Sequence, residues 1–278
     1  MIEFAETAPD ISVEPPEYQR LLGYPRDYVL SGRGRELADW ARPWYGGHGN
    51  PWVYGRRAES LEIAGGEIRI DGASFHSKRL QNTLENAAAS GVFLVAASAG
   101  PEAEQEAQRL WQEEKPDEYF FLEIFASAVV EHLFTMAGAR LCAWADGHGM
   151  AVLPHYSPGY PEWDISEQRG LLRVLEESSG HALPGPLEAL ESGALKPKKS
   201  LLGVFGVTTH IDRVQRLTEL VPCENCSLGG CQYRRTPYVR PRAQSAISEG
   251  NTVKRKALAY RAAEQHELRQ ENTDGNNE

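Results

Sequence analysis

Two short, almost wholly apolar runs stand out along the chain. They cover residues 91–97 (GVFLVAA) and 199–208 (KSLLGVFGVT). Runs of four to eight apolar residues rich in Val and Phe are typical of buried strands, so we predict a central strand at each position. A longer and mostly apolar segment at 120–138 exceeds strand length, and we predict that it forms a buried central helix.

Amphipathic segments surround these runs. Residues 61–70 alternate apolar and polar about Ala64-Gly65-Gly66, which predicts a β-hairpin. The segment 77–88 places Leu80 and Leu84 on one face of a helix. Further helices are predicted at 17–22, 33–41, 102–113 and 166–178, and a loop rich in Gly, Pro and aromatic residues at 42–52.

The order of these elements predicts an α/β fold in which helices and strands interleave. Residues 1–16 are acidic and contain proline, so we expect a flexible N-terminal arm. The folded core is expected at 17–220, followed by a cysteine-containing knuckle at 221–235. Residues 236–278 are polar and charged, and we expect a largely disordered or helical tail there.

The acidic composition argues against one class of function. The 278 residues carry a formal net charge of −10, whereas general nucleic-acid binding needs a basic surface that displaces counterions from phosphates. No apolar run reaches about 18 residues, so we expect no membrane span. The first residues, MIEFAETAPD, lack the basic and apolar regions of a signal peptide. We therefore expect a cytoplasmic protein that binds neither nucleic acid nor membrane.

Three of the four cysteines lie close together, at Cys223, Cys226 and Cys231. A C-x2-C spacing lets two thiolates meet one metal ion, and the Gly-Gly pair that follows lets the chain bend back with the third. Three thiolates do not complete a tetrahedral zinc site, so a fourth ligand is needed, and the candidates are His210 and Cys142. The spacing is compatible with zinc, with an iron–sulfur cluster, with a reduced thiol cluster or redox switch, or with an inert turn.

The segment Ser157–Pro161 (SPGYP) predicts a turn that can face a ligand. Proline fixes φ, glycine lets a backbone approach a ligand closely, and the ring of Tyr160 can lie against a flat group. Most such segments are plain turns, so the interpretation depends on the segments that accompany this one.

Those segments occur in a fixed order. They are HYSPGY at 155–160, WDISEQ at 163–168 and LESGALKPKKS at 190–200, together with YQRLLGY at 18–24, ASAG at 97–100 and FASAVVE at 125–131. The series resembles the activation module of cobalamin-dependent methionine synthase and its free-standing bacterial relatives. The resemblance covers residues 17–235, and its specificity lies in the ordered combination.

The resemblance implies an α/β fold with a twisted antiparallel sheet flanked by helices. It also implies that the protein binds S-adenosylmethionine and presents it to a corrinoid whose cobalt has been oxidised. One-electron reduction and methyl transfer would then regenerate methylcobalamin. The implied partner is a corrinoid (cobalamin-binding) protein or a truncated methionine synthase, served by an electron donor.

The resemblance also implies site residues. In the module, the arginine of R-x-x-x-G-Y meets the methionyl carboxylate, and a helix glutamate lies near the cationic part of the ligand. Carried across, Glu131 is the cation partner, and Pro158, Gly159 and Tyr160 form the ligand-facing turn.

The arginine position is occupied here by His155, whose ordinary pKa near 6.5 makes it a pH-dependent clamp for a carboxylate. Either Arg140 or Arg169 replaces the arginine, or the ligand differs, or ligand binding has been lost.

Two functions of different classes follow. The first is a corrinoid-activating accessory protein that binds S-adenosylmethionine or a related ligand. The second is a metal- or iron–sulfur-bearing redox or adaptor protein that keeps the fold without S-adenosylmethionine activity. The chain lacks the cobalamin-ligating D-x-H-x-x-G pattern, so methyl transfer would require a partner protein.

Overall fold

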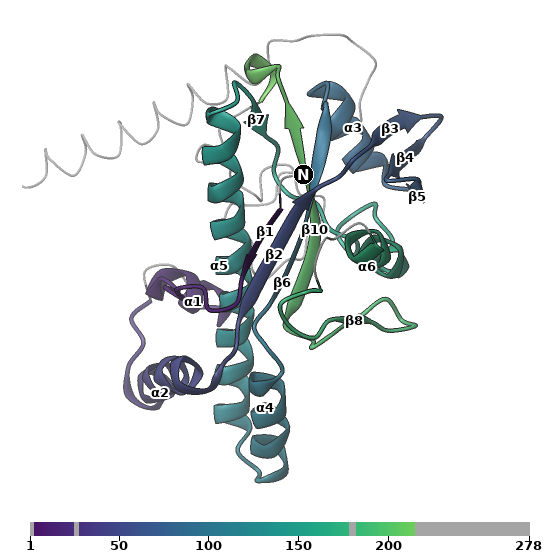
Figure 1. Cartoon of the computed structure of the whole chain (residues 1–278). Helices are drawn as coiled ribbons and strands as arrows, with labels where there is room; N and C mark the ends of the chain where they lie inside the picture. Colours follow the sequence, from purple (N-terminus) through teal and green to yellow (C-terminus); the bar gives the residue numbers. More distant parts are fainter. Residues whose placement is uncertain (1–2, 25–27, 178–181, 215–278) are drawn as a thin grey trace, which may run out of the picture. The chain divides into compact units, whose positions relative to one another are not determined.

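A five-stranded antiparallel sheet forms the centre of the protein (Figure 1). The structure is a computed structural model that describes residues 3–24, 28–177 and 182–214. The strand order is β1 (Glu3–Glu6), β2 (Trp52–Arg57), β6 (Gly91–Ser98), β10 (Ser200–Thr208) and β7 (Ala151–Val152). Helices flank the sheet, so the predicted α/β class with a twisted antiparallel sheet is confirmed.

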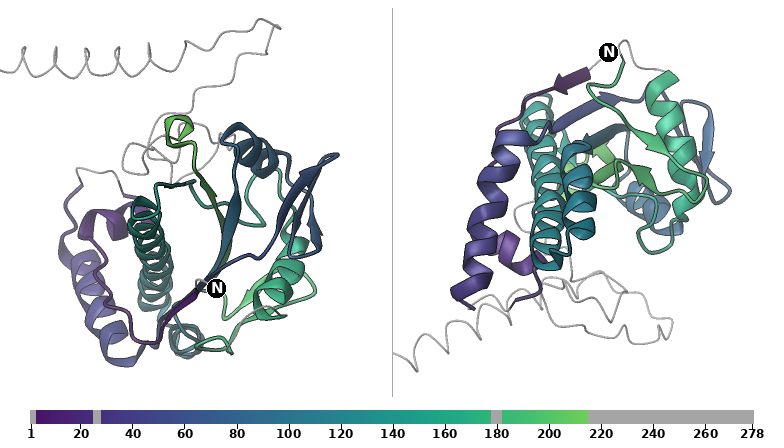
Figure 2. Two further views of the ribbon diagram at one scale, coloured as in Figure 1. Left: turned by 45° about the horizontal axis from the view of Figure 1, so that its top comes forward. Right: turned by 90° about the horizontal axis from the view of Figure 1, so that it is seen from below.

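Helices and a small second sheet cover both faces of the central sheet (Figure 2). One face packs against α1 (Pro15–Leu21), α2 (Gly32–His48) and α5 (Pro116–Asp146), with α4 (Glu102–Gln112) alongside α5. The other face packs against α3 (Lys78–Asn86), α6 (Gln168–Glu177) and the sheet of β3 (Leu61–Ala64), β4 (Glu67–Ile70) and β5 (Ala73–Phe75). Three shorter elements are η1 (Ile165–Glu167), the hairpin of β8 (Glu188–Ala189) and β9 (Leu195–Lys196), and η2 (Ile211–Arg213).

The position of strand β6 explains why residues 91–97 form an almost continuous apolar run. Phe93 and Val95 enter the core on the α5 side, whereas Val92 and Leu94 enter the core on the α6 side. All eight residues of the strand are buried. Because successive side chains point to opposite faces of a sheet, covering both faces favours apolar residues along the whole strand. Its one polar side chain, Ser98, is buried and accepts hydrogen bonds from the Gly100 N–H and from Ser200 Oγ.

Helix α5 is longer than the predicted 120–138 segment at both ends. Pro116 begins it, where the missing N–H is not needed, and Gly147 follows its last residue. By length and a mean hydropathy of 1.5 it could cross a bilayer, but 61% of that apolar window is buried within the protein. Its apolar residues pack against the sheet and the neighbouring helices, so α5 serves as the core helix.

Two segments differ from the sequence prediction. Residues 42–48, predicted to be loop, continue α2 through Pro43, because Tyr45 is buried and donates a hydrogen bond to the Ala99 carbonyl (2.6 Å). Residues 3–6, predicted to belong to a flexible arm, form β1 on the edge of the sheet. The ring of Phe4 is buried there against Gly55, which anchors the N-terminal segment. The predicted knuckle (221–235) and tail (236–278) lie outside the described residues.

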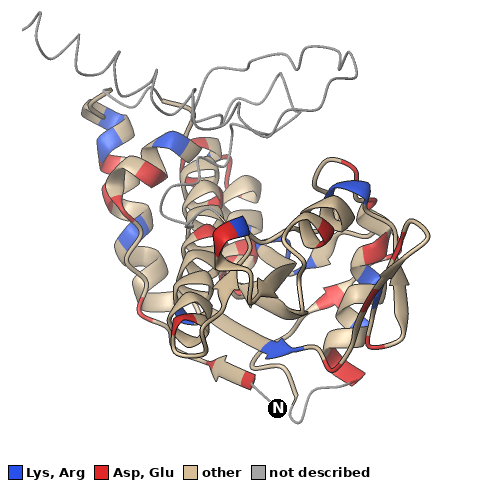
Figure 3. Cartoon of the chain, turned by 90° about the horizontal axis from the view of Figure 1, so that it is seen from above, with Lys and Arg blue, Asp and Glu red and all other residues tan. Residues whose placement is uncertain are grey.

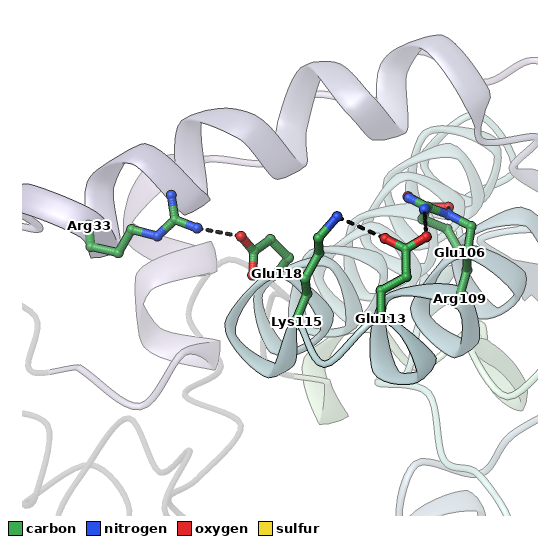
Figure 4. A network of polar contacts seen from close by, with 6 residues as sticks. All are labelled: Arg33, Glu106, Arg109, Glu113, Lys115 and Glu118. Atoms are coloured by element: carbon green, nitrogen blue, oxygen red, sulfur yellow. Dashed lines mark hydrogen bonds and ion pairs between the residues drawn. The ribbon is translucent and has the colours of Figure 1, made fainter.

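Charged side chains connect α2, α4 and α5 at one end of the helical layer. Figure 4 shows the network, which consists of Arg33, Glu106, Arg109, Glu113, Lys115 and Glu118. Lys115 Nζ lies 2.8 Å from Glu113 Oε2, and Arg109 bridges the carboxylates of Glu106 in α4 and Glu113, which directly follows α4. Acidic and basic residues are also interspersed along the other described helices (Figure 3). In each pair of the network the basic side chain is exposed, so screening by water keeps the pair weak.

Candidate functional site

The predicted turn begins directly after the chain pairs with strand β10. Tyr156 forms an isolated antiparallel bridge with Val204, with hydrogen bonds of 2.9 and 2.8 Å in both directions. The chain then turns: the Tyr160 N–H donates to the Ser157 carbonyl (3.0 Å), and the Gly159 N–H donates to the Trp163 carbonyl (2.9 Å). The turn at Ser157–Pro161 is therefore present as predicted.

Two glycines allow this turn to lie close to β10. Gly159 has φ +92°, in the left-handed region that side chains avoid. A Cβ placed on Gly203 of β10 would lie 2.7 Å from Ser157 Oγ and 3.1 Å from the ring of Phe134. The missing side chain at Gly203 therefore lets the turn and α5 approach the same point of the strand. Pro158 is buried and Gly159 is exposed, which leaves the backbone of the turn open to a ligand.

His155 lies in an aromatic environment directly before the turn. Its ring centroid is 5.0 Å from that of Phe134 and 5.4 Å from that of Phe205. The Nε2 atom is 3.2 Å from the Tyr160 hydroxyl, within hydrogen-bond distance. Burial lowers the pKa of His155 to about 4, because low-dielectric surroundings disfavour the charged ring. His155 is therefore neutral at pH 7 and does not act as a cationic clamp.

Glu131, on helix α5, lies close enough to Tyr160 to act on its hydroxyl group. Burial raises the pKa of the Tyr160 hydroxyl, and the negative charge of Glu131 raises it further. Glu131 is exposed, whereas Tyr160 is mostly enclosed. The structure thus brings together Glu131, His155 and Tyr160, which are separated by up to 29 positions in the sequence.

Neither of the two arginines considered as substitutes joins this group. Arg140 stacks over Phe4, with its guanidinium carbon 4.6 Å from the ring centroid, and pairs with Glu6. It therefore belongs to the contact between α5 and β1. Arg169 is exposed on the first turn of α6 and forms no hydrogen bond or ion pair within residues 3–24, 28–177 and 182–214.

A second polar group on α5 was not identified from the sequence as a site. Glu123 is buried and lies 2.7 Å from Lys198 Nζ and 3.2 Å from Lys199 Nζ. Lys199 Nζ also donates to Ser127 Oγ (2.8 Å). Two features of the sequence point to this group: Glu123 lies eight residues before Glu131 on one helical face, and the lysines end the 190–200 segment.

The predicted metal ligands Cys223, Cys226 and Cys231 lie outside the described residues. Of the two candidates for a fourth ligand, His210 is exposed, and Cys142 is half-buried. Burial, assisted by Asp146, raises the pKa of the Cys142 thiol, so it is protonated at neutral pH. Within the described part of the chain, no group of three His, Cys, Asp or Glu residues is arranged to hold a metal ion.

Two hollows on the surface are separate from the turn. One, of about 410 Å³, lies beside the charged network of Figure 4, and its lining includes Leu37, Trp40 and Trp44. The other, of about 470 Å³, lies between α4 and the β8–β9 hairpin and is lined by residues that include Glu104 and Pro197. The candidate site is thus defined by the contacts among the turn, β10 and α5.

Comparisons with known proteins bear on the fold. No protein-family model matches the sequence, and no curated protein matches it. Among solved structures, the chain is similar to one described as "Crystal Structure of the MetH Reactivation Domain bound to AdoHcy". The TM-score is 0.52 at 14% sequence identity, and the match covers 74% of this chain and 78% of that chain. The protein therefore has the fold of the MetH reactivation domain.

Proposed function

We propose that the protein binds an S-adenosyl ligand between the turn at residues 155–160 and helix α5, and so assists reductive methylation of a corrinoid. The observation that carries the proposal is the meeting of His155, Tyr160 and Glu131. It occurs on the fold of a domain whose solved structure contains AdoHcy. The order of motifs along the sequence supports the same ligand class.

Each residue has a physical role in this proposal. The exposed backbone at Gly159 and the ring of Tyr160 offer a surface for the flat and polar parts of the ligand. The carboxylate of Glu131 complements a sulfonium or ammonium charge. His155 is neutral and accepts or donates a single hydrogen bond at Tyr160, so we assign it a positioning role.

The corrinoid belongs to a partner in this proposal. The partner is a cytoplasmic corrinoid protein or a truncated methionine synthase, and a separate electron donor reduces its cobalt by one electron. The bound S-adenosylmethionine then supplies a methyl cation equivalent to the reduced cobalt and leaves as S-adenosylhomocysteine. The protein described here would hold and present the sulfonium.

Calorimetric titration of the full chain with S-adenosylmethionine and S-adenosylhomocysteine tests the proposal. We expect both ligands to bind and Glu131→Gln to weaken S-adenosylmethionine binding about tenfold, with a smaller effect on the uncharged thioether. Asp117→Asn is the matched control, because Asp117 is an exposed carboxylate on the first turn of the same helix. Absence of both heat and thermal shift at millimolar ligand would contradict the proposal.

The cysteine motif supports a second candidate function, a metal- or iron–sulfur-bearing redox or adaptor protein. Its support is the C-x2-C-x4-C spacing of Cys223, Cys226 and Cys231. We expect anaerobically purified protein to contain zinc or iron, and replacement of the three cysteines by serine to remove it. Elemental analysis and the visible absorption spectrum distinguish the two metals, and a colourless, metal-free protein would rule this candidate out.

A further inference from the structure

The ammonium group of Lys199 is held in a fixed position at the start of β10. It donates a hydrogen bond to Ser127 Oγ (2.8 Å) and lies 3.2 Å from Glu123 Oε2. The backbone carbonyl of Lys199 accepts a hydrogen bond from the Ala99 N–H (2.9 Å), which anchors the residue beside β6. The side chain of Lys199 is 18% exposed, so part of it still faces solvent.

The group around this ammonium contains two lysines and two acidic residues. Glu123 is shared by two ammonium groups, since Lys198 Nζ lies 2.7 Å from its other oxygen. Glu104 accepts from the backbone N–H of Lys198 (3.0 Å), and its negative charge also acts on the Lys198 ammonium. An ammonium has three donors, and Lys199 directs two of them to Ser127 and Glu123 within the described part of the chain. The remaining donor of this charged ammonium suits an anion.

The same group lies on the face of α5 that carries Glu131. Ser127 precedes Glu131 by four residues, which places them about 6 Å apart along the helix axis and on the same side. A ligand that extends from Tyr160 along α5 therefore meets negative charge at Glu131 and then positive charge at Lys199. An amino acid attached through its sulfur atom presents its charges in the complementary order. The positive sulfonium comes first, and the negative carboxylate follows, with three carbons between the sulfur and the carboxylate carbon.

We infer that Lys199 binds the carboxylate of the aminoacyl part of the S-adenosyl ligand, and that Ser127 and Glu123 position its ammonium. The inference rests on the proposed function and specifies the ligand class, which is an adenosyl thioether or sulfonium that carries a carboxylate. In this arrangement Lys199 supplies the positive charge that the neutral His155 ring cannot supply. The competing explanation is that Lys199 only connects β10 to α5, in which case its charge is irrelevant to ligands.

Two ligands and two substitutions separate these explanations. S-adenosylhomocysteine carries the carboxylate, and 5′-methylthioadenosine is a thioether nucleoside without it. By calorimetry on the full chain, we expect Lys199→Met to weaken S-adenosylhomocysteine binding about 10- to 100-fold. Binding of 5′-methylthioadenosine should change by less than about twofold, because it does not reach Lys199.

Lys198→Met is the matched control. Its ammonium contacts the other oxygen of Glu123, is 41% exposed and lies 5.7 Å from the Tyr119 ring centroid, so we expect a change of less than about threefold for both ligands. If Lys199→Met does not fold, Lys199→Gln, which can still bond to Ser127, gives the same comparison.

Equal losses for both ligands, no loss in the Lys199 variants, or an equal effect of Lys198→Met would each overturn the inference. In all three cases the wild-type protein still binds S-adenosylhomocysteine, so the proposed function survives. Failure of the wild-type protein to bind either S-adenosyl compound would instead contradict both the inference and the proposed function.

Discussion

Replacing Arg56 with methionine is expected to lower the free energy of unfolding by about 3–5 kcal/mol. The Arg56 side chain is completely buried. Its guanidinium donates to Asp71 Oδ2 (2.8 Å) and to the carbonyls of Val174 (2.6 Å) and Leu175 (3.3 Å). Methionine replaces only the aliphatic part of the arginine side chain and has no donor, so the substitution leaves a carboxylate and two helix-end carbonyls without their partner.

The expected loss of stability is large because these acceptors cannot form hydrogen bonds with water instead. Val174 and Leu175 belong to the last turns of α6, where carbonyls lack intrahelical partners and a cation is favoured. Asp71 keeps the backbone N–H groups of Glu59 (2.7 Å) and Ser60 (2.9 Å) but loses its counter-charge.

Urea denaturation at pH 7.5 measures the effect. Arg173→Met is the control, because Arg173 is 66% exposed and its pairing with Glu177 is weak, so we expect a change within about 0.5 kcal/mol. A loss below about 1 kcal/mol for Arg56→Met would show that the buried ion pair does not stabilise the fold.

Stability is expected to fall as the pH decreases from about 6.5 to about 4, and His155 should account for part of the fall. The pKa of His155 is about 4 in the folded protein, where burial disfavours the charged ring, and near 6.5 in the unfolded chain. Between these values the unfolded chain binds a proton that the folded protein does not, so the unfolding free energy decreases as protons are added. Between pH 7.5 and pH 5 the contribution is at most about 2 kcal/mol, less to the extent that water reaches the half-buried ring.

Other groups titrate in the same range, so a paired comparison is needed. The free energy of unfolding of the wild-type protein and of His155→Gln would be measured by urea titration at pH 7.5 and pH 5. The wild-type protein should lose up to about 2 kcal/mol more than the variant. Ring resonances of His155 that titrate near pH 6.5 in the folded protein would contradict the prediction, as would equal losses in the two proteins.

The central elements of the fold were predictable because their signal is local. The runs at 91–97 and 199–208 are almost wholly apolar, since both faces of the sheet are covered. The errors arose where distant contacts override local composition. Pro43 and Gly46-Gly47 are loop signals, yet burial of Tyr45 keeps that segment helical. Strand β1 exists because it pairs with residues about 50 positions away.

The candidate site was predictable only in part. The turn at 157–161 follows from its proline and glycine residues, and the resemblance to a known family indicated Glu131. No local pattern indicated that Lys199 meets Ser127, because that contact depends on where β10 begins relative to α5. The neutrality of His155 likewise depends on Phe134 and Phe205, which come from different elements.

Strand β6 has a consequence for how this protein can change over evolutionary time. Residues 92–97 of the strand require apolar side chains that fit the space available, and the packing does not demand one particular residue at each position. Substitutions among Val, Leu, Ile and Ala that are compensated across the sheet therefore keep the architecture while they erase sequence identity. The centre of the fold can consequently keep the shape of its backbone after its sequence identity with a relative has declined.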